Sequence, residues 1–545
     1  MATLHRISQV MSRPHHYAPL LLTAILFVLP LYIGAQNEFQ LIHGDCTPNL
    51  EVNTEGTNTR KATSTRRLPD INTQWDAGRI YRQLVILVEF PDAEFSRENA
   101  RDSYDHMLNE PGYNERNGMG CVAEYFRTQS NGLFNLQFDV YGPFKVSSKA
   151  QPYDNPTKST RNYGRTALEE ATRLMTEAYP EIDYSVYDWN GDGKIEQTIF
   201  ICAGYCGNAN SDIAFGYLWP NTSSFTTVTA PDGTKISNYS ASAERWPSTS
   251  VISCGIGTIC HEFSHSLGLP DIYPVNEKWT YSAVDEWDLM DGGNFTNYGW
   301  CPPNFTALEK MLMRWITPIE LTEPTTITDM KPLEEGGDAY IVRHTQTEYL
   351  LLENRQWKGW DLGIPGKGLV IYHVNFDADR WRNNSVNGVK DKFNFSLVNA
   401  DNMSYQDWNT YRTSMGYAHY QNPVWMNSFL LSSSSYPWAT DSTETVLDSL
   451  TDCSVPATLM YNSNAEGSKY LSKAITHITV SKDGHVSFDF MGGTTLDHIT
   501  VLSSSTTRAA ETIYDLQGRR LSGLTGKGIY LIKYSNGTTK KVHKQ

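Results

Sequence analysis

The chain has 545 residues and is acidic, because 60 Asp and Glu side chains outnumber 45 Lys and Arg side chains and give a formal net charge of −15. This charge argues against nucleic acid or anionic lipid as a partner, since both need a basic face. The chain is too long for a single core, and shifts in composition predict five consecutive segments with the bounds 1–35, 36–79, 80–320, 321–495 and 496–545.

Residues 1–35 have the pattern of a signal peptide. Two arginines precede the apolar run from Leu20 to Ile33, and small residues follow as far as Ala35, after which we expect cleavage. The apolar run is shorter than the ~20 residues that a membrane span requires, and Pro30 interrupts it. No later run is apolar enough to span either, so the mature form should have no transmembrane segment and should be secreted or lie on the outer cell surface.

The segment 36–79 is polar and contains the dibasic sites Arg60-Lys61 and Arg66-Arg67, which favours a propeptide removed by proteolysis. The protein would then be made as a zymogen. Asp45 and Cys46 carry side chains that can bind a catalytic metal ion and block it, although a disulfide or a solvent-exposed pair is the favoured alternative.

The segment 80–320 alternates strands and helices. The run QLVILVEF from Gln83 predicts a buried strand, Thr166 to Glu177 has helical spacing with a polar face, and the apolar run Thr198 to Ala203 predicts a further strand. This alternation indicates an α/β catalytic domain.

The loop before that last strand has oxygen-bearing side chains at alternate positions, which is a calcium-binding pattern. Asp188, Asn190, Asp192 and Glu196 occupy positions one, three, five and nine, but Ile199 replaces the glutamate expected at position twelve of an EF-hand. A metal-free turn held by Asx hydrogen bonds is the alternative.

The string HEFSHSLGLPD, from His261 to Asp271, carries the strongest chemical pattern in the chain. Residues four apart lie one above the other on a helix, so His261 and His265 can offer two imidazole nitrogens to one zinc ion. Glu262 stands beside them and can act on metal-activated water as general base and then as general acid. Gly268 permits a left-handed end to the helix, after which Asp271 can return as a third, oxygen ligand.

Two alternatives to this site remain open. A buried helix with two hydrogen-bonded histidines is disfavoured by the further matches at Gly268 and Asp271. The third ligand could instead be a carboxylate farther along the chain, Glu286 or its neighbours Asp285 and Asp288. That arrangement normally needs a second helix, and the prolines and glycines of this region leave little room for one, so Asp271 is favoured.

The string HEFSHSLGLPDIY, together with WDLMDGG from Trp287 to Gly293, resembles the immune inhibitor A type of secreted zinc metallopeptidase, a metzincin-like zincin family. The resemblance implies an α/β zincin fold with zinc as cofactor, and it places Met290 in a methionine turn that forms a packing floor beneath the metal ligands. It extends through the segments 122–143, 187–197, 305–321, 348–374 and 483–490.

The segment 321–495 is predicted to be β-rich, because short runs such as Glu348 to Glu353 and Gly368 to Val374 alternate with Gly, Pro, Asn and Ser. His373 is expected to be a strand residue and not a zinc ligand, since His261 and His265 already supply the two nitrogen ligands of the predicted zinc site.

The segment 496–545 predicts a small C-terminal β-sandwich module with short strands at Thr512 to Leu516 and Gly528 to Tyr534. It resembles the C-terminal sorting domain of type IX secretion cargo, which implies the outer-membrane secretion machinery as a partner. A carbohydrate-binding or structural β appendage is the alternative.

Eight cysteines could form disulfides in an exported chain, but the sequence does not select among the 105 pairings that eight cysteines allow. Their spacing lacks the paired motifs of a structural zinc site.

The patterns together predict a secreted zinc-dependent endopeptidase that hydrolyses peptide bonds of proteins, with calcium as a second ion. The alternative is a catalytically inactive surface binding or adhesion protein on a metalloprotease scaffold, which would use Trp and Tyr side chains for recognition. The intact Glu262 argues against that alternative, because a scaffold kept only for binding needs no general base.

Overall fold

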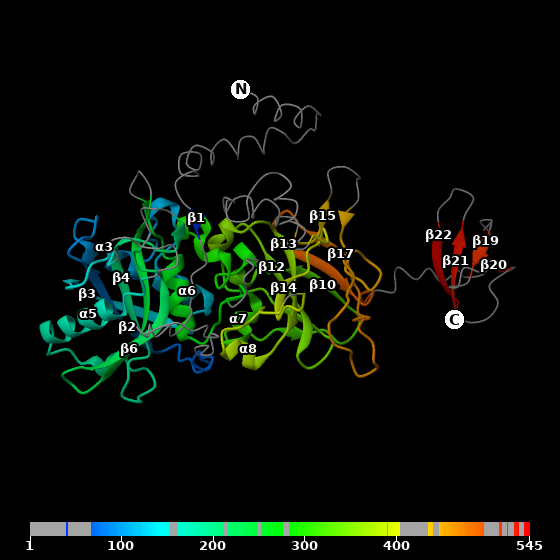
Figure 1. Ribbon diagram of the computed structural model, residues 1–545. Coiled ribbons are helices and arrows are strands. Elements are labelled where there is room, and N and C mark those ends of the chain that lie inside the picture. Colours follow the sequence, from blue (N-terminus) through cyan, green and yellow to red (C-terminus); the bar gives the residue numbers. More distant parts are fainter. Residues whose placement is uncertain are drawn as a thin grey trace, which may run out of the picture.

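Figure 1 shows the computed structural model of the chain. Within the residues that it describes, no helix has both the length and the apolar character needed to cross a bilayer. The described residues are 40–41, 67–152, 162–210, 216–247, 252–275, 283–389, 391–403, 434–439, 446–494, 512–514, 520–521, 528–533 and 539–544.

We call the described residues from 67 to 494 the body. Its N-terminal half, which runs to about the predicted boundary at residue 320, is built on a mixed six-stranded sheet (Figure 1). Four of its strands are parallel, and one edge strand, β6, runs antiparallel to them. In their order across the sheet, the strands are β3 (Asn135–Lys145), β2 (Ile80–Glu89), β4 (Thr198–Tyr205), β7 (Lys235–Trp246) and β6 (Asn221–Thr229), with β8 (Ile252–Ser253) paired to β7.

The strand β2 is buried on both faces of this sheet. Val85 and Leu87 belong to the core on one face, whereas Leu84, Ile86 and Val88 belong to the core on the other. Side chains alternate across a strand, so the nearly continuous apolar run in this part of the sequence is what an internal parallel strand requires.

Helices cover both faces of the sheet. The helix α5 (Arg165–Ala178) packs on one face through Leu168, Ala171 and Met175. The other face carries α3 (Ala100–Asn109), α4 (Val122–Gln129) and α6 (Gly257–Ser266), whose apolar residues share one core. The remaining short elements of this half are β1 (Gln40–Leu41), paired with β5 (Ala209–Asn210), and the 3-10 turns η1 (Glu115–Asn117) and η2 (Tyr184–Tyr187).

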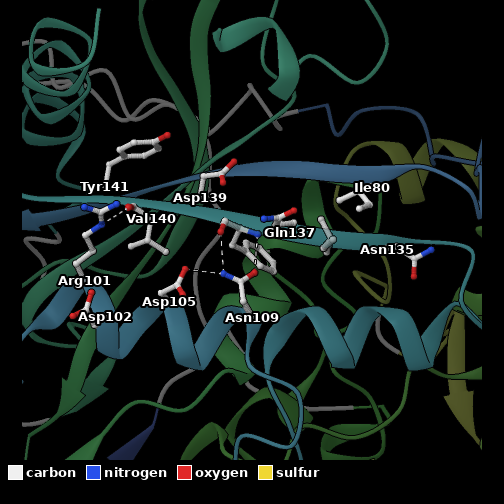
Figure 2. Close-up of a pocket in the computed structure, with 12 residues that line it drawn as sticks. Ile80, Arg101, Asp102, Asp105, Asn109, Asn135, Gln137, Asp139, Val140 and Tyr141 are labelled. Carbon is white, nitrogen blue, oxygen red and sulfur yellow. Dashed lines mark hydrogen bonds between the residues drawn. The ribbon is translucent and has the colours of Figure 1, made fainter. Parts of the chain in front are cut away.

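The outer edge of β3 is covered by side chains of α3 (Figure 2). The amide of Asn109 accepts from the backbone N–H of Phe138 and donates to its carbonyl oxygen, both at 2.9 Å, and Arg101 donates to the carbonyl of Val140 at 3.0 Å. These side chains occupy hydrogen-bonding positions that an added strand would use. A surface cavity of about 950 Å³ lies here, and none of the predicted site residues lines it.

The second half of the body is built on a five-stranded sheet. In their order across the sheet, its strands are β14 (Phe395–Leu397), β13 (Gly368–Asn375), β12 (Glu348–Arg355), β11 (Tyr340–Arg343) and β9 (Ile319–Glu320). A three-stranded sheet of β10 (Thr325–Met330), β18 (Val486–Phe490) and β17 (Ile475–Val480) packs on it, with the pair β15 (Trp438–Ala439) and β16 (Val446–Leu447) nearby.

The hydrophobic core runs across the predicted boundary at residue 320. On β12, Tyr349 and Leu351 belong to the core that also contains α4 and α6, whereas Leu350 and Leu352 belong to the core shared with the three-stranded sheet. The five-stranded sheet is therefore sandwiched, and one of its faces completes the core of the N-terminal half.

Short helices connect these strands, and a separate small sheet follows them. The connecting elements are α7 (Ala307–Leu312), α8 (Ala378–Arg382) and the 3-10 turns η3 (Asp285–Trp287), η4 (Gly292–Gly299), η5 (Leu333–Glu335) and η6 (Gly359–Gly363). The last strands form a four-stranded antiparallel sheet, drawn in red in Figure 1, with the order β20 (Arg520–Leu521), β19 (Thr512–Tyr514), β21 (Gly528–Lys533) and β22 (Thr539–Lys544).

Residues 68–75, which we call the strap, pack against both halves of the body. Leu68 is buried, and Asn72 donates its backbone N–H to the carbonyl of Leu267 at 3.0 Å. Trp75 donates its ring N–H to the carbonyl of Met313 at 2.6 Å and lies against the ring of Phe134. The predicted end of the propeptide at residue 79 therefore does not coincide with a structural boundary.

Candidate metal centre

The helix α6 carries the histidine pair and is buried from Gly257 to His265, with only its last residue, Ser266, partly exposed. Ile259, Cys260 and Phe263 anchor it in the core beneath the sheet. The helix is followed by Gly268 with a φ of +92°, and a Cβ atom at this glycine would lie 2.6 Å from the Cα atom of Ile71 in the strap. Only glycine meets both conditions, so the chain can turn back toward the helix at this point.

The turn brings Asp271 against the two histidines. The rings of His261 and His265 are 5.0 Å apart and nearly perpendicular, and their Nε2 atoms lie 3.1 and 3.4 Å from Oδ1 of Asp271. One ligand atom from each residue lies within 4.8 Å of the other two. Among the residues that the structure describes, this is the one cluster of three or more His, Cys, Asp or Glu side chains with such spacing.

The second nitrogen of each histidine is held by a backbone carbonyl. Nδ1 of His261 lies 2.9 Å from the carbonyl oxygen of Leu289, and Nδ1 of His265 lies 2.7 Å from that of Leu269. A carbonyl oxygen only accepts, so each neutral ring carries its proton on Nδ1 and keeps a lone pair on Nε2, the atom that faces Asp271. Metal-binding histidines are oriented in this way.

The electrostatics of the cluster favour a positive charge beside Asp271. Burial alone would raise the pKa of this carboxyl, but the two imidazole rings hold it well below its ordinary value. Burial alone would lower the pKa of His261, whereas its hydrogen bond to Asp271 and the charge of Glu262 raise that pKa to about 9. The side chains of both histidines and of Asp271 are almost completely buried.

Glu262 lies on the same helix and faces the edge strand β6. The hydroxyl of Thr222 on β6 lies 2.8 Å from Oε2 of Glu262 and 2.7 Å from its backbone carbonyl oxygen, and it can donate its proton to either. The carboxyl group of Glu262 is buried at the start of the second turn of α6, next to His261. No pattern in the sequence indicates Thr222, because nothing local relates it to a helix forty residues later.

Met290 is fully buried in the same core cluster as α6. Its N–H donates to Oδ1 of Asp288 at 2.6 Å, and its carbonyl accepts from the N–H of Ile272, next to Asp271, at 2.9 Å. The preceding carbonyl, of Leu289, holds His261. The turn that contains Met290 is thus joined to His261 and to the residue that follows Asp271.

The alternative third ligands lie outside the cluster. Burial raises the pKa of Glu286 well above its ordinary value, and the charge of Asp285 adds to this effect. Asp288 accepts a hydrogen bond from the backbone N–H of Met290. Burial, followed by the charges of Glu309 and Asp291, raises the pKa of Asp288 as well. None of the three carboxyls joins the histidine pair within 4.8 Å.

The predicted calcium loop directs its oxygens toward its own backbone. Asp188 accepts from the N–H groups of Gly191, Asp192 and Gly193, and Glu196 accepts from those of Trp189 and Asn190. Burial raises the pKa of Glu196 to about 7, against the effect of these hydrogen bonds. The carboxylates of the loop do not form a cluster of three among the described residues.

His373 lies on β13, as the sequence predicted, and its Nε2 is 2.8 Å from Oε1 of Glu348 on β12. Asp45 and Cys46 lie outside the described residues.

Residues 74–315 match the family model described as the catalytic domain of immune inhibitor A peptidase M6. This region is therefore similar to the catalytic domain of immune inhibitor A-like metallopeptidases. It contains α6, Asp271 and Met290, so the geometry above and the family match concern the same residues.

Three curated relatives are similar to this region at low identity. The pre-pro-metalloprotease PrtV of Vibrio cholerae is 23% identical over 288 residues, which are 45% of this chain and 31% of the relative. Immune inhibitor A of Bacillus thuringiensis is 24% identical over 272 residues, which are 42% of this chain and 38% of the relative. The protein named "Putative secreted metallopeptidase" of Arthroderma benhamiae is 27% identical over 228 residues, which are 36% of this chain and 32% of the relative. The chain spans about a third of the length of these relatives.

Proposed function

We propose that the chain is a secreted zinc-dependent endopeptidase. The observation that carries the proposal is the convergence of His261, His265 and Asp271 on one point, directly beside Glu262, within an immune inhibitor A-like domain. Two neutral imidazoles and one carboxylate are the donor set of a catalytic zinc site, which keeps a fourth position for water.

The residues fit a zinc ion in their chemistry as well as their spacing. The Nδ1 atoms donate to the carbonyls of Leu289 and Leu269, so each Nε2 atom would offer its lone pair to a bound ion, which would displace the proton of His261. The low pKa of Asp271 keeps this ligand ionised. A bound zinc ion would activate water and polarise the scissile carbonyl.

Glu262 is the proposed proton carrier of the reaction. It takes a proton from the attacking water and returns it to the leaving amine as the peptide bond breaks. The hydroxyl of Thr222 lies 2.8 Å from Oε2 of this carboxylate and can donate to it, which orients the carboxylate on its helix. Met290 is proposed to support the ligands by packing beneath them, as the resemblance implies.

The closed state of the centre supports synthesis as a zymogen. His261, His265 and Glu262 are each 1% exposed and Asp271 is fully buried, so a polypeptide substrate needs the site to open. We propose that removal of a propeptide within 36–79 provides this opening. The signal peptide at 1–35 and the sorting function of 496–545, with the outer-membrane secretion machinery as partner, belong to the same proposal.

The proposal is tested with an unfolded protein substrate such as casein and the activated enzyme. We expect hydrolysis that is abolished by a zinc chelator, restored by added Zn²⁺, and abolished by Glu262→Gln without loss of bound metal. Glu334→Gln, which changes an exposed glutamate away from the histidine pair, is the control that keeps activity. Hydrolysis that survives both the chelator and Glu262→Gln would overturn the proposal. No observation favours the inactive binding protein predicted as the alternative.

A calcium ion in the loop of Asp188, Asn190, Asp192 and Glu196 remains part of the proposal. Binding would require these side chains to turn from the backbone N–H groups that they now accept from. We expect a calcium titration to raise the melting temperature of the wild type and to have no effect on Asp188→Asn. Equal response of both proteins would assign the loop to a metal-free turn.

A further inference from the structure

The proposed third ligand, Asp271, is held by a residue from outside the family-matched region. Asn384 accepts the backbone N–H of Asp271 through Oδ1 at 2.7 Å and donates its Nδ2 to Oδ2 of Asp271, also at 2.7 Å. Oδ1 of the same carboxylate faces the two histidines. Each oxygen of Asp271 therefore has a separate partner, and Asn384 is only 5% exposed.

The chain places Asn384 through α8 and an unusual backbone conformation. Asn384 has a φ of +47°, a left-handed conformation that asparagine tolerates better than most residues. Its N–H donates to the carbonyl of Trp381 at 3.3 Å, and Trp381 is buried in the core shared by the two halves. The amide is thus held in place before any metal arrives.

The strap fastens the same segment from its other side. Leu68 donates its N–H to the carbonyl of Arg382 at 2.8 Å, and Arg382 forms an ion pair of 2.8 Å with Asp70. Two residues farther on, Asn72 bonds to Leu267, next to the glycine that turns the chain toward Asp271. The strap, α8 and the end of α6 therefore meet around this carboxylate.

We propose that Asn384 is a positioning residue for the metal centre: it occupies Oδ2 of Asp271 so that Oδ1 alone is presented to the ion. This inference rests on the proposed function. A carboxylate has about four acceptor sites, and a free one can rotate or bind an ion through both oxygens. The centre is then assembled by the matched region and by the segment after residue 320 together, so neither part binds zinc tightly alone.

The test compares two asparagines of one loop. Asn384→Asp keeps the side-chain size, the acceptor for the N–H of Asp271 and the tolerance of positive φ, but it loses the donor to Oδ2. Asn387→Asp is the matched control, because Asn387 is also buried, has a φ of +56° and donates its side-chain amide to the backbone carbonyls of Ile272 and Phe395.

Three readouts separate positioning from folding. We expect Asn384→Asp to weaken Zn²⁺ binding by about 10- to 100-fold in competition with a chromophoric chelator, whereas Asn387→Asp stays within about threefold of the wild type. With Co²⁺ as a probe, the visible absorption bands should shift in Asn384→Asp only. Melting in excess chelator measures the effect of each substitution on the fold without metal.

The outcomes distinguish this inference from the proposed function. If Asn384→Asp binds Zn²⁺ with the wild-type affinity and gives the wild-type Co²⁺ spectrum, or if both variants lose affinity equally, Asn384 has no positioning role. If the wild type itself takes up no Zn²⁺, the proposed function fails and the inference fails with it.

A second, independent observation concerns two cysteines near the start of α6. The sulfur atoms of Cys206 and Cys254 lie 3.1 Å apart, closer than two unbonded sulfur atoms normally pack. Cys206 follows β4 and Cys254 follows β8, and both donate their N–H groups to β7, at Arg245 and Glu244. They are buried in an apolar cluster with Trp246 and Phe295.

We infer that Cys206 and Cys254 form a disulfide in the exported protein. The two thiols give up two protons and two electrons to the disulfide of a thiol–disulfide oxidoreductase, whose sulfurs become two thiols as the new S–S bond forms. The bond would tie the end of β4 to the segment that leads into Gly257, the first residue of α6. The crosslink thus braces the helix that carries the histidines.

The test uses protein recovered from an oxidising compartment, unfolded without reductant and alkylated. We expect Cys206 and Cys254 to escape alkylation and to appear as one linked peptide that separates on reduction, while Cys453, which is exposed, is labelled. A reductant should lower the melting temperature of the wild type but not that of the Cys206→Ser, Cys254→Ser double variant. Full alkylation of both residues before reduction would refute the disulfide.

Discussion

The substitution Arg355→Met tests how firmly the two halves of the body are joined. Arg355 lies on β12 with its side chain 3% exposed. It forms a two-point pair with Asp361, with both N–O distances 2.6 Å, and a third contact of 3.0 Å with Glu353. It also donates to the carbonyl oxygens of Trp287 and Asn304 in the N-terminal half.

The expected loss in the free energy of unfolding follows from the buried charges that remain after the substitution. Methionine fills a similar volume, but two carboxylates stay buried with their principal cation removed, which costs about 3–5 kcal/mol in comparable buried pairs. That loss is a large part of the ~5–15 kcal/mol by which folded domains are usually stable. Arg343→Met on the neighbouring strand is the control, because its 2.9 Å pair with Glu320 is partly exposed and such pairs contribute about 0–1 kcal/mol.

Urea unfolding followed by tryptophan fluorescence measures both free energies. We expect the midpoint to fall strongly for Arg355→Met and slightly for Arg343→Met, with a single transition in each. The double variant Arg355→Met, Asp361→Leu should recover part of the loss, because it removes one uncompensated charge. Equal losses for the two single variants would refute the view that this buried network joins the halves.

Three further outcomes follow from single sites. Gly268→Ala should destabilise the fold by about 2 kcal/mol or more in urea, because alanine resists the positive φ and its Cβ would meet the strap; a neutral effect would contradict this. Thr222→Val should lower kcat about tenfold, a loss of about 1.4 kcal/mol, with KM and bound zinc unchanged, since only the hydroxyl held against Glu262 is lost; a change in KM alone would point to substrate binding instead. Burial alone would raise the pKa of Glu348, but hydrogen bonds from His373 and two backbone amides lower it to about 2, so its contribution to stability should be lost as pH falls from the ordinary value of 4.5 toward 2. Glu348→Gln should flatten that part of the pH–stability curve, and an unchanged curve would contradict the assignment.

Local patterns in the sequence were sufficient for several of the regular elements. The strand from Gln83, the helix at Thr166 to Glu177 and the strands at Thr198 and Glu348 are confirmed within one or a few residues by β2, α5, β4 and β12. In these runs the spacing of the apolar residues predicts both the type of element and whether one or both of its faces are buried.

Contacts between distant parts of the chain could not be predicted in this way. Thr222, Asn384 and the strap reach the metal centre from segments whose sequences hold no metal-binding pattern. The boundary at residue 320 was placed where composition changes, yet the apolar faces on either side of it share one core. Periodicity tells which face of a strand is buried, but not which element covers that face.

The metal content of the purified, folded protein tests the proposed centre most directly. We expect about one zinc ion per chain in the wild type and in Glu262→Gln, as in catalytic sites with three protein ligands, and almost none in His265→Ala. Circular dichroism on the same samples confirms that each variant is folded. Folded wild-type protein that neither contains zinc nor takes it up, or a full zinc content in His265→Ala, would contradict the proposed metal centre.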